Sequence, residues 1–292
     1  MRSFLFVPAD SDKKLDKAMT SGADALLIDL EDSIALDGKA RARDSAAAFV
    51  RNAVTATTRP YLCVRVNGLQ TGLTDADLDA VAPAKPDAIM LPKAEGGASV
   101  IHAAAKLAVR EAQNDLPDGH IKILPIATET AASLFVAGTF ASARERLIGL
   151  TWGAEDLSAE LGADTNRDAQ GQFLDPYRLA RTLCLAGAAA AQVPAIDTVY
   201  VDFRNEQGFR RECEEAARDG FVGKMAIHPA QVPVINAAFT PSPKALARAH
   251  AIVDAFARNP GAGVVGIDGV MYDRPHLARA QRLLASGKPA AR

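Results

Sequence analysis

The chain has 292 residues, 49% of them hydrophobic and 23% charged, which is enough for one large globular core. Its 33 basic residues nearly balance 35 acidic ones, and no basic stripe of the kind that binds nucleic acid is present. The apolar runs are too short to cross a bilayer, and the first residues lack a signal-peptide pattern, so we expect a cytoplasmic protein. Three cysteines without paired spacing (Cys63, Cys184 and Cys213) indicate neither a disulfide framework nor a zinc site.

Hydrophobic periodicity predicts eight strands that alternate with alanine-rich amphipathic helices. The expected strands are residues 4–7, 25–30, 61–66, 88–91, 121–127, 147–150, 196–201 and 224–227. The clearest helices between them are residues 39–52, 99–113, 176–192 and 206–219. This alternation predicts an α/β protein with a (β/α)₈ or TIM barrel. The alternative, a doubly wound open sheet, lacks its glycine-rich first turn, because the first strand runs into Pro8.

We assign residues 1–240 to the barrel, with the metal and substrate site, and residues 241–292 to a C-terminal helical extension. The extension reads as two helices, at 244–258 and around 275–285, joined by a glycine-rich segment at 261–269. That segment is interpreted as a flexible hinge or a simple connector.

The residues that close the strands combine several carboxylates with a few cations. They are Asp29, Glu31 and Asp32 at the end of the second strand, Arg65 at the end of the third, Lys93 at the fourth, Glu129 at the fifth, Asp156 at the sixth, Asp202 at the seventh and His228 at the eighth. Ligands of parallel α/β proteins bind at the carboxyl ends of the strands. Glu129 and Asp156 therefore suggest a hard-cation site. The alternative is that each of these two acids caps the helix that follows it.

Each cation has two interpretations. Arg65 can grip a substrate carboxylate through two parallel bonds, or serve as a structural partner of Glu31 or Asp32. Lys93 can act as a Schiff-base nucleophile if burial lowers its pKa, whereas neighbouring carboxylates favour an ion-pair or anion-binding role. His228 can contact a ligand or belong to the core or a hinge.

Motifs in a fixed order along the chain resemble the citrate lyase beta subunit-like proteins, a group of acyl-CoA lyases and class II aldolases on (β/α)₈ barrels. The matching segments are residues 2–9, 22–32 with Lys39 and Arg43, 65–67, 91–93, 129–131, 153–157, 223–231 and 269–275. The resemblance implies Mg²⁺ held by Glu129 and Asp156, and Arg65 on the carboxylate of oxaloacetate, glyoxylate or pyruvate.

The resemblance also implies a catalytic acid/base, Asp273, that reaches the site of a neighbouring subunit. The extension is then a lid swapped between subunits, and we expect a homotrimer or a multiple of it. Without the family, Asp273 would be read as a helix N-cap before Arg274-Pro275.

The implied activity is Mg²⁺-dependent cleavage of malyl-, citramalyl- or citryl-CoA to acetyl-CoA or propionyl-CoA and a 2-oxo acid. Glu31, Asp32 and Lys93 join Arg65 as substrate-binding residues, and Lys39, Arg43 and His228 are the expected coenzyme A contacts. Alternatives are a class II pyruvate aldolase without coenzyme A, thioester hydrolysis at the same site, and a citrate lyase beta subunit that acts on an acyl carrier protein.

Overall fold

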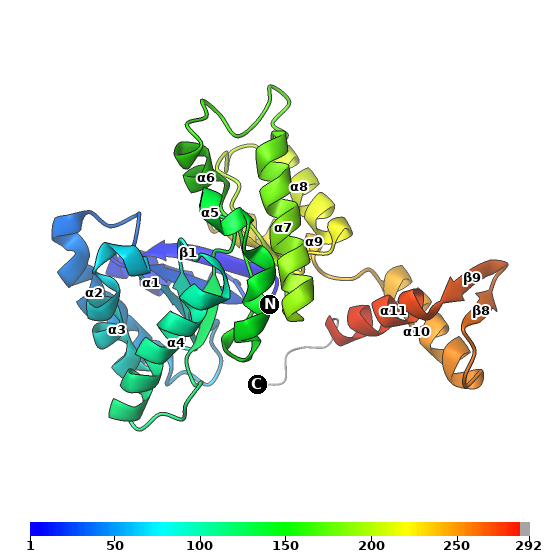
Figure 1. Ribbon diagram of the computed structural model, residues 1–292, viewed down its shortest axis with the longest axis horizontal. Coiled ribbons are helices and arrows are strands. Elements are labelled where there is room, and N and C mark those ends of the chain that lie inside the picture. The colour runs from blue at the N-terminus through cyan, green and yellow to red at the C-terminus, as the bar shows by residue number, and fades with distance from the viewer. Residues whose placement is uncertain (287–292) are drawn as a thin grey trace. The chain divides into compact units, whose positions relative to one another are not determined.

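The computed structural model describes residues 1–286, and the chain divides into two compact units, Met1–Asn236 and Ala237–Arg292 (Figure 1). The larger unit is built on seven parallel strands in the order β5-β4-β3-β2-β1-β7-β6. These strands are β1 Ser3–Pro8, β2 Ala25–Asp29, β3 Tyr61–Arg65, β4 Ala88–Leu91, β5 Lys122–Pro125, β6 Ile196–Asp197 and β7 Gly223–Ala226. The chain forms a parallel α/β sheet, as the alternating pattern predicts.

The segment 147–151 connects the two edges of this sheet. Isolated parallel bridges pair Leu147 with Ile123, Thr151 with Ile126, and Leu150 with Ala195. The predicted strand at 147–150 is therefore wrong as a regular strand, and the strand expected at 196–201 shortens to two residues. Pro125 and Pro194 flank the segment on its two sides, and a proline cannot donate to a ladder. The curled sheet is consistent with the predicted barrel, with seven regular strands instead of eight.

Side chains at alternate positions of the strands fill the inside of the curled sheet. The inner layer consists of Phe4, Ala25, Leu27, Cys63, Ala88, Met90, Leu124, Ile126, Ile196 and Met225. Because side chains alternate between the two faces of a strand, Asp29 and Arg65, two positions beyond Leu27 and Cys63, continue this inner face at the carboxyl end. The register of β2 and β3 pairs Asp29 directly with Arg65.

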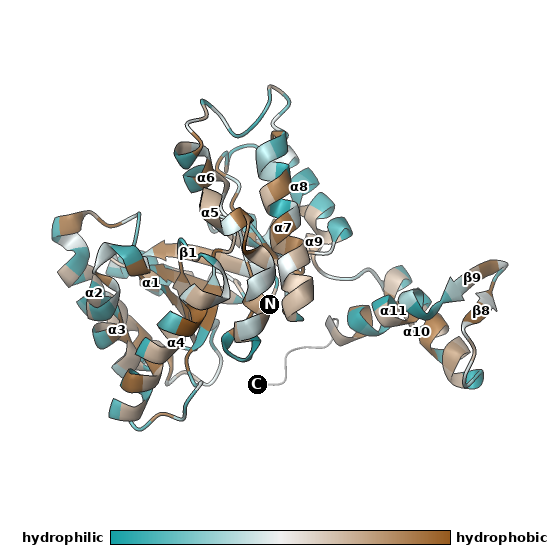
Figure 2. Cartoon of the chain, viewed as in Figure 1, coloured by the Kyte–Doolittle hydropathy of each residue, from teal (hydrophilic) through white to brown (hydrophobic). Residues whose placement is uncertain are grey.

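Helices follow the strands and cover the outside of the sheet (Figure 1). They are α1 Asp12–Ala18, α2 Lys39–Ala53, α3 Thr74–Val81, α4 Gly96–Gln113, α5 Ala131–Leu134, α6 Ala154–Glu160, α7 Asp175–Ala191, α8 Glu206–Asp219 and α9 Gln231–Ala238. Figure 2 shows brown, hydrophobic strands and a mostly teal loop between α6 and α7. Within residues 1–286, no helix is long and apolar enough to span a membrane.

The smaller unit contains a β-hairpin that the sequence pattern did not predict. Helix α10, Pro243–Arg258, precedes strands β8, Val264–Ile267, and β9, Val270–Asp273, which pair antiparallel, and α11, Arg274–Ser286, follows. The two turn residues, Asp268 and Gly269, both have positive φ, of 52° and 77°. An Asp-Gly pair of this kind favours a two-residue hairpin. Residues 264–269 of the glycine-rich segment therefore form a strand and a tight turn, and only residues 261–263 remain as a link between α10 and β8.

Candidate active site

A paired aspartate and arginine form the base of the site. Arg65 Nε and Nη2 donate to the two carboxylate oxygens of Asp29 at 2.6 and 2.7 Å. Burial raises the pKa of Asp29, but the hydrogen bonds and charge of Arg65 outweigh burial and hold that pKa below its usual value. Arg65 Nη1 lies 2.9 Å from Glu31 Oε2 and 3.2 Å from Asp32 Oδ2. The structural ion pairs expected for Arg65 are present.

Lys93 connects the arginine side of the site to the two acids expected to bind metal. Its backbone has a positive φ of 53°, which is uncommon outside glycine. Its backbone N–H donates to Glu129 Oε2 at 2.6 Å. Its ammonium lies 2.7 Å from Glu31 Oε1 and 3.1 Å from Asp156 Oδ1. Its ammonium also lies 4.0 Å from Asp32 Oδ1, so this one residue contacts four of the predicted carboxylates.

The charges around Lys93 decide between its two interpretations. Burial lowers the pKa of Lys93, but the hydrogen bond to Glu31 and the charges of Glu129 and Asp156 raise it above the ordinary value. A permanently protonated amine is not a nucleophile. The contacts favour the ion-pair role and disfavour a Schiff base.

Glu129 follows β5 and is almost completely buried, at 2% exposure. Burial and the nearby Asp156 carboxylate raise the pKa of Glu129 to about 8, against the opposing charge of Lys93. Burial likewise raises the pKa of Glu31 to about 7, although Arg65 and Lys93 oppose the shift. Burial therefore favours the neutral form of both carboxyls as long as no further cation is bound beside them.

Neither Glu129 nor Asp156 caps a helix. Helix α5 is capped by Thr130, whose side chain accepts a hydrogen bond from Ser133 N. Helix α6 begins after Gly153 and has no side-chain cap, and Asp156 lies in its first turn. The helix-cap alternative for the two acids is therefore wrong.

The donor set fits magnesium. Mg²⁺ keeps several waters and binds proteins through one or two carboxylates, together with substrate oxygens. Glu129 and Asp156 supply that number, and within residues 1–286 no cluster of three or more metal-ligating side chains competes with them. Gly153 lies against Glu129, where a Cβ added to the glycine would meet the glutamate Cγ at 3.2 Å and Oε1 at 3.4 Å.

We expect Gly153→Ala to weaken magnesium binding several-fold, because the added methyl group displaces the Glu129 carboxylate by a few tenths of an ångström. Isothermal titration with Mg²⁺ measures the effect. Gly138→Ala is the matched control, since a Cβ at Gly138 meets nothing within 4 Å. Equal affinities for the two variants would contradict the prediction.

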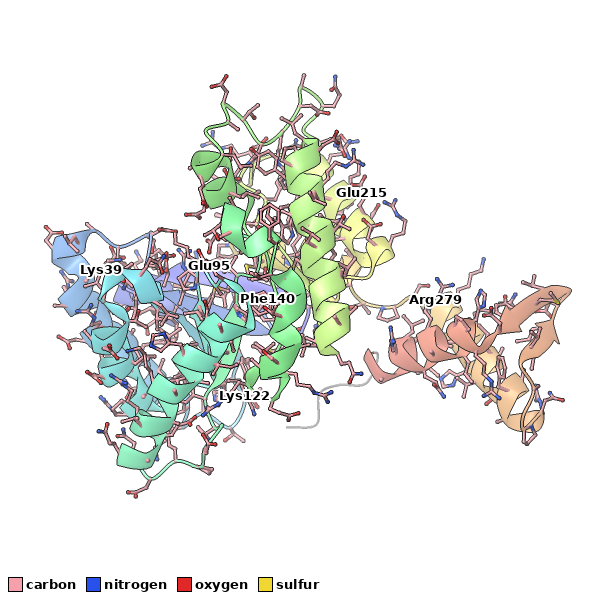
Figure 3. All side chains as sticks on the ribbon, viewed as in Figure 1. Lys39, Glu95, Lys122, Phe140, Glu215 and Arg279 are labelled. Atoms are coloured by element: carbon pink, nitrogen blue, oxygen red, sulfur yellow. The ribbon has the colours of Figure 1, made fainter. Side chains whose placement is uncertain are left out.

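The three expected coenzyme A contacts differ in their surroundings. Lys39 Nζ donates to the carbonyl oxygens of Leu30 and Glu31, each at 2.7 Å. Arg43 Nε donates to Asp77 at 2.7 Å. The exposed ring of His228 stacks on Phe203, with centroids 5.1 Å apart. In Figure 3, Lys39 lies apart from Lys122, which begins β5 at the amino end.

Asp273 belongs to the smaller unit, where it ends β9. Its carboxylate accepts a hydrogen bond from His276 N at 3.3 Å, which is the N-cap geometry expected from the sequence alone. His276 Nδ1 also lies 2.5 Å from the same oxygen, Oδ1. That hydrogen bond lowers the pKa of Asp273.

Sequence reasoning missed the role of Asp29. This residue stands at the end of the second strand, but the partners expected for Arg65 are Glu31 and Asp32. The signal is the period of two: residues 25, 27 and 29 share one face of β2, as 61, 63 and 65 do on β3. Aligning the two strands would have placed Asp29 beside Arg65.

A curled parallel sheet with acids, an arginine and a lysine gathered at its strand ends is consistent with the barrel class of α/β proteins, whose ligand sites lie at the carboxyl ends of the strands. The chain belongs to the HpcH/HpaI aldolase/citrate lyase family, whose sequence profile matches residues 2–229. The family resemblance inferred from the motifs is confirmed.

Relatives with known names cover nearly the whole chain. A (3S)-malyl-CoA thioesterase of Cereibacter sphaeroides is 38% identical over 99% of this chain and 95% of its own length. The mitochondrial citramalyl-CoA lyase of Rattus norvegicus is 32% identical over 97% of this chain and 85% of its own length. The crystal structure of protein CitE from Mycobacterium tuberculosis, in complex with magnesium, acetoacetate and coenzyme A, is 34% identical. It has a TM-score of 0.77 and covers 98% of this chain and 97% of that one.

Proposed function

We propose that this protein is a Mg²⁺-dependent acyl-CoA lyase that cleaves a short β-hydroxyacyl-CoA of the malyl, citramalyl or citryl type. The products are acetyl-CoA or propionyl-CoA and a 2-oxo acid. One observation carries the proposal. Lys93 contacts Glu129, Asp156 and the Arg65 partner Glu31 at 2.6 to 3.1 Å, and so connects the carboxylate pair to the arginine. A cation-binding pair beside an arginine suits a substrate with a carboxylate and an adjacent hydroxyl. The magnesium, acetoacetate and coenzyme A in the CitE structure support the same assignment.

Negative charge develops at two places on the substrate during cleavage, and the site has to stabilise it at both. The bond between the thioester α-carbon and the hydroxyl-bearing carbon breaks, so the hydroxyl oxygen loses its proton while the thioester becomes an enolate. Magnesium, when bound by Glu129 and Asp156, lowers the pKa of a hydroxyl that it coordinates. Arg65 orients the carboxylate of the substrate. Glu31 and Asp32 hold its guanidinium through ion pairs, and Lys93 balances the negative charge of Glu31.

Asp273 supplies the proton transfer at carbon in this scheme. It protonates the enolate carbon in cleavage and removes the same proton in the reverse condensation. Its lowered pKa leaves it ionised at neutral pH, which is the form that condensation requires. We assign residues 241–292 to a lid, exchanged between the subunits of a trimer, that brings Asp273 to a neighbouring site; residues 287–292 of this assignment lie outside the described part of the chain.

Coenzyme A contacts are assigned to Lys39, Arg43 and His228. Lys39 and Arg43 donate hydrogen bonds to other groups of the protein. Their contribution to coenzyme A binding is therefore chiefly their positive charge. The exposed His228 ring, stacked on Phe203, offers a flat surface for direct contact. A thermal shift at saturating coenzyme A tests this binding, since a ligand that binds only the folded state raises the melting temperature. An unchanged melting temperature favours the aldolase that works without coenzyme A.

Turnover of malyl-CoA, citramalyl-CoA and citryl-CoA by the isolated chain with Mg²⁺ tests the proposal directly. We expect one of the three to yield a 2-oxo acid in equal amount to the shortened acyl-CoA, and EDTA to abolish the reaction. No turnover of any of them would reject the lyase and direct attention to thioesters carried by an acyl carrier protein.

Arg65→Lys is expected to raise the KM for the 2-oxo acid in condensation about 10- to 100-fold, because lysine keeps the charge but cannot form the two parallel hydrogen bonds to Asp29 that hold the cation in place. Arg59→Lys is the matched control. Arg59 also binds one aspartate, Asp87, through two nitrogens, but it precedes β3, whereas Arg65 ends this strand. Equal changes in KM for the two variants would show that only folding is affected.

A further inference from the structure

Six side chains on the outer face of the sheet form one closed network of contacts, the Trp152 network. Its members come from the segment before α6, the loop between α6 and α7, and β6, β7 and α8, and they are Trp152, Arg167, Phe173, Asp197, Glu212 and Lys224. Ile196 and Met225 face the inside of the sheet, so the neighbouring Asp197 and Lys224 face outward. Both are completely buried. The network therefore lies between the sheet and its covering helices, outside the strand-end site.

The polar half of the network consists of hydrogen bonds and ion pairs. Trp152 Nε1 donates to Asp197 Oδ1 at 2.8 Å. Lys224 Nζ lies 2.7 Å from Asp197 Oδ2 and 2.8 Å from Glu212 Oε1. Arg167 Nη1 lies 2.7 Å from Glu212 Oε2. Each buried charge has a partner of the opposite sign, as a charge removed from water requires.

The aromatic half closes the network. The guanidinium carbon of Arg167 lies 3.7 Å from the centre of the Phe173 ring. Phe173 in turn meets Trp152 edge-on, with ring centroids 5.0 Å apart. The contacts thus return to the residue from which they started, and each member is held from two sides.

This network contacts the chain on both sides of helix α6, which carries Asp156. Trp152 lies two residues before the helix, and Arg167 and Phe173 lie in the loop that follows it (Figure 1). Helix α6 has seven residues and no side-chain cap, and the Asp156 side chain in its first turn is 35% exposed. A helix this short has little stability of its own. Contacts at its two ends therefore help to decide where Asp156 lies.

Trp152 also precedes the residue that lies against Glu129. The backbone at Gly153 is extended, and a Cβ added there would meet Glu129 Cγ at 3.2 Å. The outward Trp152 side chain is 1% exposed and is anchored to Asp197. One anchored side chain thus fixes the backbone that runs past Glu129 and on to Asp156.

We propose that the Trp152 network positions Asp156 beside Glu129 for magnesium binding. Trp152 and Arg167 are then positioning residues, which act through α6 and contact neither metal nor substrate. The inference rests on the proposed function, because it requires the metal site at Glu129 and Asp156. Groups that orient metal ligands from behind contribute about 10- to 100-fold to metal affinity or activity.

Arg167→Gln opens the network and leaves no buried charge unpaired, since Glu212 keeps its contact with Lys224. We expect the magnesium affinity, measured by titration calorimetry, to fall about 10-fold or more, and Arg167→Lys, which keeps the ion pair, to retain most of it. Arg110→Gln is the matched control. Arg110 is 13% exposed, against 15% for Arg167, and pairs with two aspartates of α3. Its loss should lower stability but not magnesium affinity.

A second measurement needs no metal. Trp152 is the only tryptophan of the chain, so its fluorescence reports on the network directly. In EDTA, acrylamide should quench the emission of Arg167→Gln more strongly than that of the wild type or Arg110→Gln, because the loop with Phe173 is no longer held against the indole. Trp152→Phe removes the indole N–H but keeps an aromatic ring, and it should also lower magnesium affinity.

The outcomes separate this inference from the lyase assignment. Unchanged magnesium affinity in folded Arg167→Gln or Trp152→Phe, or an equal loss in Arg110→Gln, overturns the positioning role while the lyase stands. Unchanged quenching in Arg167→Gln overturns it as well, because the network would then not hold the loop. A wild-type chain that binds no magnesium rejects the metal site of the proposed function, and the positioning role with it.

Discussion

Replacing Glu129 with glutamine is expected to reduce turnover by about 10³-fold or more, because Lewis-acid stabilisation is worth several kcal/mol and each factor of ten corresponds to about 1.4 kcal/mol. Glutamine has nearly the same shape but no charge, and Glu129 is buried, so water cannot take over its role. Magnesium affinity should fall with activity, measured by titration calorimetry on the metal-free protein. Asp156→Asn is expected to act in the same direction.

Glu155→Gln is the matched control for both variants. Glu155 is exposed, precedes Asp156 in the first turn of α6, and accepts a hydrogen bond from Asn166. We expect its removal to leave turnover and magnesium affinity close to those of the wild type. Unchanged metal affinity in Glu129→Gln and Asp156→Asn would remove the metal site from these two residues.

The pH dependence of the metal site follows from the raised pKa of Glu129. Below pH 8 the metal has to displace a proton from this carboxyl, whose pKa is about 8. Magnesium affinity should then fall by about tenfold per pH unit below that value and level off above it. Affinity that does not vary between about pH 6 and pH 9 would contradict an ionised Glu129 as a ligand.

The stability of the metal-free protein should change with pH in the opposite direction to the magnesium affinity and fall as the pH rises. A carboxyl whose pKa is higher in the folded state stabilises the fold fully below its ordinary pKa and loses that contribution as the pH rises to about 8. In EDTA, Glu129→Gln should therefore melt at a higher temperature than the wild type at about pH 9, and at nearly the same temperature at about pH 5. Greater stability together with lost activity is typical of a residue selected for a site.

Much of the site could be predicted from the sequence because the residues change from apolar to charged where each strand ends. Buried apolar runs stop at Glu31, Arg65, Lys93 and Glu129, and parallel strands bring such positions to one face. The contacts among Arg65, Lys93 and the carboxylates follow from this rule.

The remaining features depend on information that hydrophobic periodicity does not contain. Bridges at 147–151 replace a regular strand where prolines flank the segment, and an apolar run alone does not reveal the missing ladder bonds. The hairpin around Asp268-Gly269 was hidden because glycines at 261, 263, 266 and 269 look like a flexible connector. An Asp-Gly pair between two short β-forming segments was the signal that could have identified it.

The proposed exchange of the lid between subunits predicts that two inactive variants restore each other. Glu129→Gln removes the metal half of a site, and Asp273→Asn removes the acid/base, so each alone should be inactive. If every site of a ring takes Asp273 from a neighbouring copy, a mixed assembly pairs the intact metal half of one variant with the intact Asp273 of the other. Random mixing in equal amounts should restore about a quarter of the wild-type sites over all assemblies, and about a third in mixed trimers separated from the uniform ones. Co-expression with two different affinity tags allows the mixed assemblies to be purified and assayed.

A second mixture separates exchange between copies from other causes of recovery. Glu129→Gln and Asp156→Asn both damage the metal half, so their mixed assemblies contain no intact metal site and should remain inactive. Recovery in the first mixture alone requires that metal half and acid/base come from different chains. If purified mixed assemblies of the first pair stay inactive, Asp273 serves the site of its own chain, and the extension is a lid that closes within one subunit.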